Sequence, residues 1–193
     1  MLTMPERLLE YEREWFLAVN GAHTWWFDCL MLAFASPWAW FPLPVVPLYF
    51  FLKRRAEATS LLVCTLLAGI ANGLLTEVFF KPFFHRFRPV HHPSFMHEVR
   101  TVSDYIASGD YGFISGHSAN AFAFAVLSSL AVKDKRYSLA ILTWAAIMAY
   151  SRVYLGAHFI TDIIPGMMAG ALIGWLLYSL HKKLSGTGVG ITN

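Results

Sequence analysis

The sequence has little charge and little cysteine. Asp, Glu, Lys and Arg make up only 14% of the 193 residues, and 56% of the residues are hydrophobic. Soluble domains usually carry about 25% charged residues, so this deficit excludes an ordinary soluble domain and indicates an integral membrane domain. The two cysteines, Cys29 and Cys64, both lie in apolar stretches. We therefore expect two buried thiols and no disulfide framework.

The N-terminus lacks the pattern of a cleaved signal peptide. It reads MLTMPERLLEYERE, which is polar and acidic and has no small-residue cleavage site after an apolar core. We expect the membrane segments themselves to direct insertion. A nucleic-acid partner is not expected either, because the net charge of +3 is spread over short loops.

Apolar runs alternate with short polar connections along most of the chain. A transmembrane helix needs about 20 apolar residues, and the pattern predicts an all-α bundle of six membrane-spanning helices, of which the first two are short. The runs cover residues 23–37, 38–52, 59–80, 112–132, 138–156 and 159–180.

Both ends of the chain differ from the predicted bundle. Residues 4–19 predict an amphipathic helix, which either lies in the membrane interface or packs on the bundle. The last residues, 185–193, read SGTGVGITN and predict a disordered tail. We therefore expect one membrane domain over residues 1–184.

The basic residues predict how the helices are oriented. If the N-terminus is inside, ten Lys and Arg residues fall on one side of the membrane and five on the other, so the first side is expected to be cytoplasmic. The five outer cations oppose this trend, and they cluster in or near residues 81–111 and 151–158. Since residues 81–111 also form the one long connection, we expect a function at the outer face.

Three polar clusters border helix ends on this outer side. Lys81, Arg88 and Arg152 have no matching carboxylates nearby, which predicts a site for a multiply charged anion such as phosphate. Ser115 and Gly116 stand where a helix begins, and free N–H groups and the helix dipole favour an anion there. The clusters read KPFFHRFRP (81–89), ISGH (114–117) and SRVYLGAHFITD (151–162).

Two histidines in these clusters could carry out phosphoryl transfer. His158 and Asp162 are four residues apart, so on one helix they would share a face. A carboxylate that accepts from one imidazole nitrogen leaves the other nitrogen free to attack. His117 has no such partner and suits a general acid. The rest of the reaction requires positioning and charge stabilisation, which the three cations could supply.

Together the clusters resemble the tripartite signature of the type 2 phosphatidic acid phosphatase family. They match it as K-x6-R-P at Lys81–Pro89, S-G-H at Ser115–His117, and S-R-x5-H-x3-D at Ser151–Asp162. The family shares a superfamily with the vanadium-dependent haloperoxidases. One position departs, because Ile114 stands where the second motif usually has Pro. This alters the turn before the helix but removes no reacting group.

The resemblance implies a role for each matched residue. His158 would be the nucleophile that forms a phosphohistidine, Asp162 would orient it, and His117 would be the general acid. It also implies that no metal or other cofactor is needed, and that the partners are a lipid phosphate and the lipid bilayer. The oligomeric state cannot be predicted. The implied phosphate-binding residues are Lys81, Arg88, Ser115, Gly116 and Arg152.

The implied protein is a lipid phosphatase of the bacterial inner membrane, with its active site facing the periplasm. Among the family's substrates we favour undecaprenyl pyrophosphate. Phosphatidylglycerophosphate, phosphatidic acid and lipid A phosphates are the alternatives. Two other classes stay open, a vanadate-dependent oxidase and a non-catalytic lipid-phosphate-binding protein.

Several residues outside the signature allow two interpretations. An i,i+4 ion pair between Glu77 and Lys81 is the plain expectation, and tuning of Lys81 is the alternative. The loop residues His91, His92, His97 and Glu98 fit no standard metal-ligand spacing, so a solvated loop is preferred to a metal site.

Two further sets have proposed structural roles. Asp104, Tyr105 and Asp110 are candidates to shape a headgroup entrance. Glycines recur every fourth residue near the C-terminus and predict a close helix-packing face. They are Gly166, Gly170 and Gly174.

Overall fold

A computed structural model of the chain describes residues 6–53, 55–103, 105 and 107–186. Regular structure in this part of the chain is helical, apart from an isolated bridge between Phe87 and Tyr111. The elements are α1 (Glu6–Gly21), α2 (Trp25–Ala35), η1 (Pro37–Trp40), α3 (Pro42–Lys53), α4 (Arg55–Gly73), η2 (Leu74–Phe80), α5 (Lys81–Phe84), η3 (Pro89–His91), η4 (Met96–Glu98), α6 (Gly116–Val132), α7 (Lys135–Tyr154) and α8 (Ile160–Gly186).

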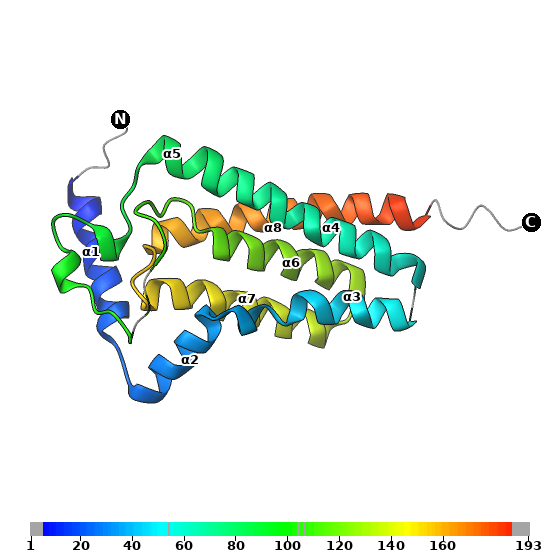
Figure 1. Cartoon of the computed structure of the whole chain (residues 1–193), viewed down its shortest axis with the longest axis horizontal. Helices are drawn as coiled ribbons and strands as arrows, with labels where there is room; N and C mark the ends of the chain where they lie inside the picture. Colours follow the sequence, from blue (N-terminus) through cyan, green and yellow to red (C-terminus); the bar gives the residue numbers. More distant parts are fainter. Residues whose placement is uncertain (1–5, 54, 104, 106, 187–193) are drawn as a thin grey trace, which may run out of the picture.

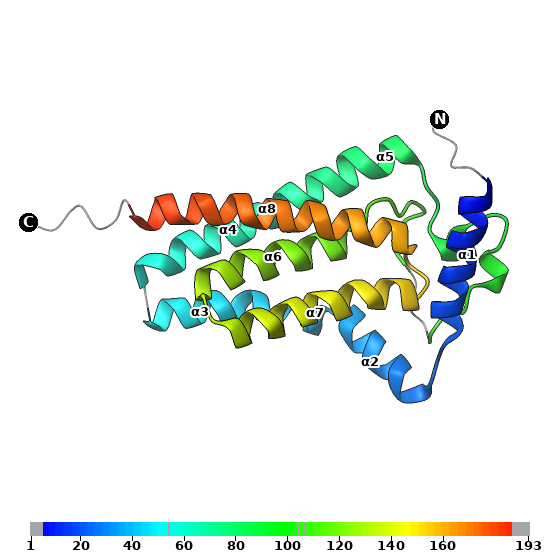
Figure 2. The ribbon, with the colours of Figure 1, turned by 180° about the vertical axis from the view of Figure 1, so that it is seen from behind.

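Most helices run along the long axis of the molecule, and α1 lies across one end (Figures 1 and 2). By length and composition, two helical segments of the described chain could cross a membrane, Glu57–Phe84 and Ile160–Ser185. A third is possible if α2 and the η1–α3 segment count as one bent span, and α6 is apolar but shorter. The predicted number of six spans is therefore not confirmed.

The bend between α2 and α3 has a local cause. The two parts meet at 58°, and Ser36 between them is in an extended conformation. Pro37 follows it, and a residue before proline is disfavoured in the helical region because its backbone clashes with the ring. The helix therefore ends at Ala35 and resumes after a short 3₁₀ turn. Trp144 of α7 donates to the carbonyl of Ala39, 2.9 Å away, and ties this turn to the bundle.

The position of α1 corrects the predicted topology. Because α2, η1 and α3 together run along the bundle once, α1 lies at the same end as residues 81–111 (Figure 1). Arg13 pairs with Glu98, and Glu12 with Arg86. The prediction that the N-terminal helix lies on the side opposite to residues 81–111 is therefore wrong. Among the described residues, seven Lys and Arg then fall at this end and seven at the other, so charge counting gives little support to an orientation.

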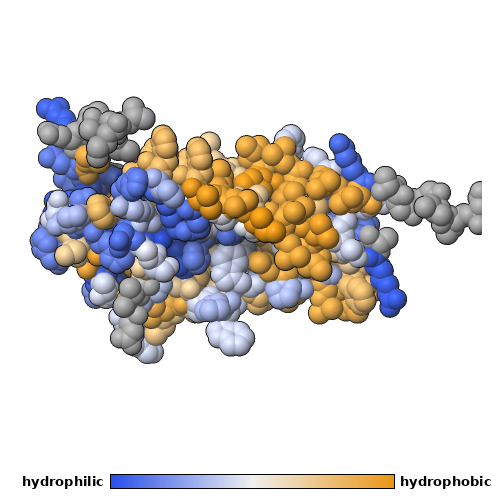
Figure 3. All heavy atoms as spheres, turned by 45° about the horizontal axis from the view of Figure 1, so that its top comes forward, coloured by the Kyte–Doolittle hydropathy of each residue, from blue (hydrophilic) through white to orange (hydrophobic). Residues whose placement is uncertain are grey.

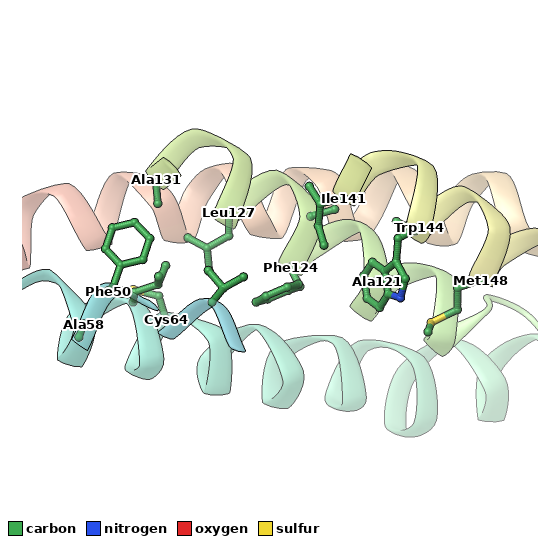
Figure 4. Close-up of a cluster of buried hydrophobic side chains, with 14 residues drawn as sticks. Phe50, Ala58, Cys64, Ala121, Phe124, Leu127, Ala131, Ile141, Trp144 and Met148 are labelled. Atoms are coloured by element: carbon green, nitrogen blue, oxygen red, sulfur yellow. The ribbon is translucent and has the colours of Figure 1, made fainter. Parts of the chain in front are cut away.

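The main apolar core lies between the long helices (Figure 4). Phe50 of α3, Leu61 of α4, Phe124 of α6 and Trp144 of α7 all contribute to it. Cys64 is fully buried in the same cluster, as predicted. Both thiols are free, but the prediction that Cys29 is buried is wrong. In α2 the buried contact is made by Met31 instead, with Phe27 packed beside it.

The surface shows a division along the long axis. Hydrophobic atoms cover the length of the helical bundle, whereas hydrophilic atoms gather at the end that carries α1 and the connecting segments (Figure 3). A broad apolar surface of this kind is expected where side chains face lipid rather than water. Helix α8 continues to Gly186, so Ser185 and Gly186 are helical and do not belong to a disordered tail as predicted. Residues 187–193 lie outside the described residues.

The predicted glycine face is confirmed. A Cβ added at Gly170 would lie 2.0 Å from the carbonyl oxygen of Ala119, and one added at Gly174 would lie 2.3 Å from that of Ala123. A Cβ at Gly166 would lie 2.7 Å from the carbonyl oxygen of Ser115. All three of these oxygens belong to the backbone. Helix α8 therefore packs directly against the main chain of α6 over three successive turns.

Replacing Gly170 by alanine should destabilise the protein. The added methyl group meets the α6 backbone, and overpacking of this kind costs about 1–3 kcal/mol. The midpoint of thermal unfolding in detergent should fall accordingly. Gly69→Ala on α4 is the matched control, because a Cβ at Gly69 meets nothing within 4 Å. An unchanged midpoint for Gly170→Ala would show that the two helices separate easily.

Candidate active site

Backbone hydrogen bonds bring the three sequence motifs together. The amide of Val90 donates to the carbonyl of Gly156 at 3.3 Å, which joins the first motif to the third. The amide of Ser115 donates to the carbonyl of Asp162 at 3.1 Å, which joins the second to the third. The site thus forms at the end of the bundle where α5 ends, α6 begins, and α7 connects to α8.

His158 lies just before α8 and is only 2% exposed. Its Nε2 atom is 2.9 Å from Nη1 of Arg88. Because a guanidinium can only donate, Nε2 must accept, so the ring proton is on Nδ1. That nitrogen faces Oδ2 of Asp162 at 3.5 Å and has no hydrogen bond of its own. The geometry therefore leaves the lone pair of Nε2 on the side of the cations.

Asp162 is fully buried in the first turn of α8. Its Oδ2 atom accepts from the amide of Phe159 at 2.9 Å. Its Oδ1 atom accepts from Nη1 of Arg86 at 2.5 Å. The sequence motifs predicted that Asp162 lies near His158, and they gave no indication of this arginine.

Arg88 and Arg152 are buried cations that contact only neutral acceptors. Arg88 is 5% exposed, and besides His158 it donates to the carbonyls of Gly109 and Ala157 at 2.9 and 3.0 Å. Arg152 is 2% exposed and donates to the hydroxyl of Tyr105 at 3.1 Å and more weakly to Ser151 and Phe34. Among the described residues no carboxylate bonds either guanidinium, which leaves both charges available to an anion.

Lys81 differs from the two arginines. Its ammonium group forms the expected i,i+4 ion pair with Glu77, which confirms the plain interpretation of this pair. The expectation that Lys81 has no matching carboxylate is therefore wrong. The Lys81 side chain is largely buried and that of Glu77 is exposed. An anion in the site would compete with Glu77 for this cation.

The second motif forms the start of α6. Ser115 is the N-cap, and its hydroxyl oxygen accepts from the amide and hydroxyl of Ser118. A Cβ at Gly116 would lie 3.2 Å from Oγ1 of Thr76, so the backbone passes close to η2 here. His117 is exposed, with its ring 5.8 Å from that of Trp40. His117 follows Ser115 by two residues, and the amide of Ser115 bonds to Asp162, so His117 lies at the same end of the bundle as His158.

The loop histidines do not gather around a common point. His91 is 3.6 Å from Asp110, and His97 is 3.7 Å from Glu98. Among the described residues, no group of three or more His, Cys, Asp or Glu side chains could hold a metal ion.

The proposed headgroup entrance is described only in part. Tyr105 contacts Arg152, as noted above, and the side chain of Asp110 is 71% exposed. Asp104 lies outside the described residues. The role of these side chains at the entrance stays a prediction.

A polar network that the motifs do not contain holds the end of α7. Arg100 forms two hydrogen bonds with Asp28, at 2.8 and 3.2 Å. Asp28 also accepts from the hydroxyl of Tyr154 at 2.5 Å. The side-chain amide of Asn20 donates to the backbone carbonyl of Tyr154 at 2.8 Å. These contacts fix the segment between Arg152 and His158. Their separations in the chain exceed 70 residues, so no local pattern could reveal them.

We expect His158 to remain neutral in mildly acidic solution. Burial lowers the pKa of His158 to about 4, and the positive charge of Arg88 acts in the same direction while Asp162 opposes it. This pKa lies below that of an unfolded histidine, about 6.5, so the unfolded chain takes up a proton before the folded one. The free energy of unfolding should therefore fall as the pH falls from about 6.5 towards 4. Nitrogen NMR of ¹⁵N-histidine-labelled protein in detergent, assigned with His158→Gln, should show the neutral tautomer at pH 5.5. A protonated ring at that pH would contradict the buried, cation-flanked geometry.

The geometry agrees with comparisons to known proteins. Residues 57–185 match the PAP2 superfamily, which is more than half of the chain. The chain therefore belongs to this superfamily, and the family resemblance of the three motifs is confirmed.

Two relatives and one solved structure illustrate the similarity. A lipid A 4′-phosphatase of Porphyromonas gingivalis is 39% identical over 91% of this chain and 75% of its own length. An undecaprenyl-diphosphatase of Bacillus subtilis is 23% identical over 89% of this chain and 84% of its own. The crystal structure of a transmembrane PAP2-type phosphatidylglycerolphosphate phosphatase from Bacillus subtilis superposes with a TM-score of 0.72 at 21% identity, covering 93% of this chain and 88% of that one. The chain is thus a membrane lipid phosphate phosphatase of the PAP2 type.

Proposed function

We propose that the protein hydrolyses the 4′-phosphate monoester of a glycolipid of the lipid A type and releases inorganic phosphate. The support is the 39% identity to a lipid A 4′-phosphatase over most of both chains. The undecaprenyl-diphosphatase is more distant, at 23% identity. Undecaprenyl pyrophosphate, which the motifs alone led us to favour, becomes the alternative substrate.

The chemistry that we propose starts from His158. Its Nε2 lone pair attacks phosphorus, and the bond to the lipid oxygen breaks as the N–P bond forms. Arg88, which donates to Nε2 in the free protein, turns its donors to the phosphate oxygens beside Arg152. Asp162 stabilises the positive charge that develops on the ring. The observation that carries this proposal is the buried Nε2 acceptor next to a cation without a carboxylate partner.

His117 completes the proposed reaction. As the imidazolium it gives a proton to the departing lipid oxygen, so the lipid leaves as an alcohol and His117 becomes neutral. The neutral imidazole then takes a proton from a water molecule that attacks the phosphohistidine, which releases inorganic phosphate and restores His158. The exposure of His117 on the open side of the site suits a group that must meet both the lipid and water.

We also propose a membrane arrangement for this reaction. The bent α2–α3 segment, the α4–α5 rod, α6, α7 and α8 would each cross the bacterial inner membrane once. This is five crossings in place of six. The site and α1 would then face the periplasm, with α1 lying in the interface. The support is that these segments alternate in direction along the long axis (Figures 1 and 2).

The proposal is tested by phosphate release from detergent-purified protein in excess EDTA. Lipid A, undecaprenyl pyrophosphate, phosphatidylglycerophosphate and phosphatidic acid are compared, with His158→Ala as the control. We expect lipid A to be the fastest substrate, mass spectrometry to place the lost phosphate at the 4′ position, and the control to be inactive. Faster release from undecaprenyl pyrophosphate would overturn the substrate. No release from any lipid, together with vanadate-dependent halogenation in peroxide, would move the protein to the oxidative class.

A further inference from the structure

Arg86 lies two residues before Arg88 but has entirely different contacts. Its Nη1 atom donates to Oδ1 of Asp162 at 2.5 Å and to Oγ1 of Thr161 at 2.7 Å. Its Nη2 atom donates to Glu12 of α1. The hydroxyl of Thr161 also donates to Glu12, so the four side chains form a closed network.

The network is buried at the junction of α1 with the start of α8. Asp162 is fully buried, and the side chains of Glu12 and Arg86 are 8% and 20% exposed. The guanidinium of Arg86 stacks against the ring of Phe159, 4.7 Å from its centroid. Burial raises the pKa of the Glu12 carboxyl, and its bond to Arg86 opposes this. Buried charges of this kind depend on each other, because removing one partner leaves the others desolvated and unpaired.

These contacts separate Arg86 from the phosphate-binding cations. Within the described part of the chain, Arg88 and Arg152 donate only to neutral acceptors, which leaves their charges for an anion. Arg86 already lies between two carboxylates, Glu12 and Asp162. A third anion would have to displace one of them. The site therefore does not use Arg86 as a further phosphate ligand.

The two oxygens of Asp162 are divided between different tasks. Oδ1 is held by Arg86, and Oδ2 accepts from the amide of Phe159 and faces Nδ1 of His158. Without Arg86 the carboxylate would lose both its charge partner and the contact that fixes its rotation. The imidazole would then lose the fixed carboxylate that faces its Nδ1 atom and stabilises positive charge on the ring.

We propose that Arg86 is a positioning residue of the phosphatase and that Glu12 holds Arg86 in place, so that the N-terminal helix α1 is part of the active site. Arg86 acts on His158 through Asp162, and Glu12 acts through Arg86. This inference rests on the proposed phosphohistidine reaction.

The first test compares kcat with phosphate affinity in Arg86→Gln and Glu12→Gln. Outer partners of a functional histidine contribute about 10- to 100-fold, so we expect kcat to fall about 100-fold for Arg86→Gln and about 10-fold for Glu12→Gln. The inhibition constant of inorganic phosphate should stay within about twofold, because Lys81, Arg88 and Arg152 are untouched. Arg86→Lys should recover part of kcat, since lysine keeps the charge but lacks the guanidinium fork.

Arg13→Gln is the matched control on the same helix. Arg13 forms an ion pair with Glu98 and stacks on Phe95, so it anchors α1 without contacting Arg86 or Asp162. Its kcat should stay within about twofold, as for ion pairs away from the site. The double variant Glu12→Gln/Arg86→Gln should be no slower than Arg86→Gln alone, whereas adding Arg13→Gln should change kcat only by its own small factor.

The outcomes separate this inference from the proposed function. Phosphate release by His158→Ala would overturn the phosphohistidine reaction itself. An inactive His158→Ala together with unimpaired Arg86→Gln would overturn only the positioning role. Loss of phosphate affinity in Arg86→Gln would make Arg86 a phosphate ligand, and an Arg13→Gln defect equal to that of Glu12→Gln would reduce α1 to a structural support. Unfolding midpoints are measured for all variants. If Arg86→Gln does not fold, the kcat and phosphate inhibition of Arg86→Lys and Glu12→Gln decide the question.

Discussion

Replacing His158 by alanine is expected to abolish turnover, with a loss of about 10⁴-fold or more. A variant without its nucleophile retains only what binding and charge stabilisation provide. The lost ring is the one whose Nε2 atom faces Arg88 inside the buried site. The measurement is single-turnover release of labelled phosphate, combined with trapping of an acid-labile, base-stable phosphoprotein in the unmodified enzyme.

His97→Ala is the control for this prediction. His97 lies in the long loop, its side chain is 71% exposed, and its nearest charged partner is Glu98. Its removal should leave turnover within about twofold, as for most surface substitutions. A labelled phosphoprotein that persists in His158→Ala, or is absent from the unmodified enzyme during turnover, would contradict covalent catalysis by this histidine.

Replacing Arg88 by alanine should cause the second largest loss, about 10²- to 10³-fold in kcat. That is the usual effect of removing one donor that stabilises charge in a transition state. Arg88 is suited to this role because it is buried, charged and bonded only to neutral acceptors. Arg88→Lys should recover part of the loss, since a point charge replaces a planar fork. Steady-state kcat and KM, with inhibition by inorganic phosphate, provide the measurement.

The control for Arg88 is Arg136→Gln. Arg136 is exposed near the start of α7, at the end of the bundle opposite the site. Its replacement should leave kcat and phosphate inhibition unchanged within about twofold, since it only alters surface charge. If Arg88→Ala and Arg136→Gln were equally impaired, the loss would reflect general electrostatics rather than contact with the phosphate.

Local patterns predicted the parts of the fold that depend on neighbouring residues. The spacing of Gly166, Gly170 and Gly174 revealed the contact of α8 with α6, and the spacing of Glu77 and Lys81 revealed their ion pair. The course of the first helices could not be predicted in this way. A proline after Ser36 is compatible with a turn between two spans and with a bend inside one rod, and the packing of Trp144 on the turn supports the second.

The same limit applies to the site. The motifs place His158, Asp162 and Arg88 correctly in one neighbourhood, because spacing along the chain specifies them. The family motif selects Arg88 by its spacing from Lys81, but it gives Arg86 no role. The different roles of the two arginines lie in their partners. Those partners are Glu12, which is 74 residues away, and the backbone around Gly109 and Ala157.

The main-chain contact between α6 and α8 determines where the protein can open for a bulky lipid. Ser115 begins one of these helices and Asp162 lies in the first turn of the other, and a backbone hydrogen bond joins them. At the glycines the two backbones approach too closely to leave room for even a methyl group between them, so the helices are closely packed here. The groups that these two helices carry, His117 and Asp162, are therefore held in a fixed relation, and we expect a bulky lipid to enter elsewhere than between α6 and α8. Amide hydrogen exchange should accordingly be slow at the start of α6 and of α8, and lipid binding should leave it unchanged there.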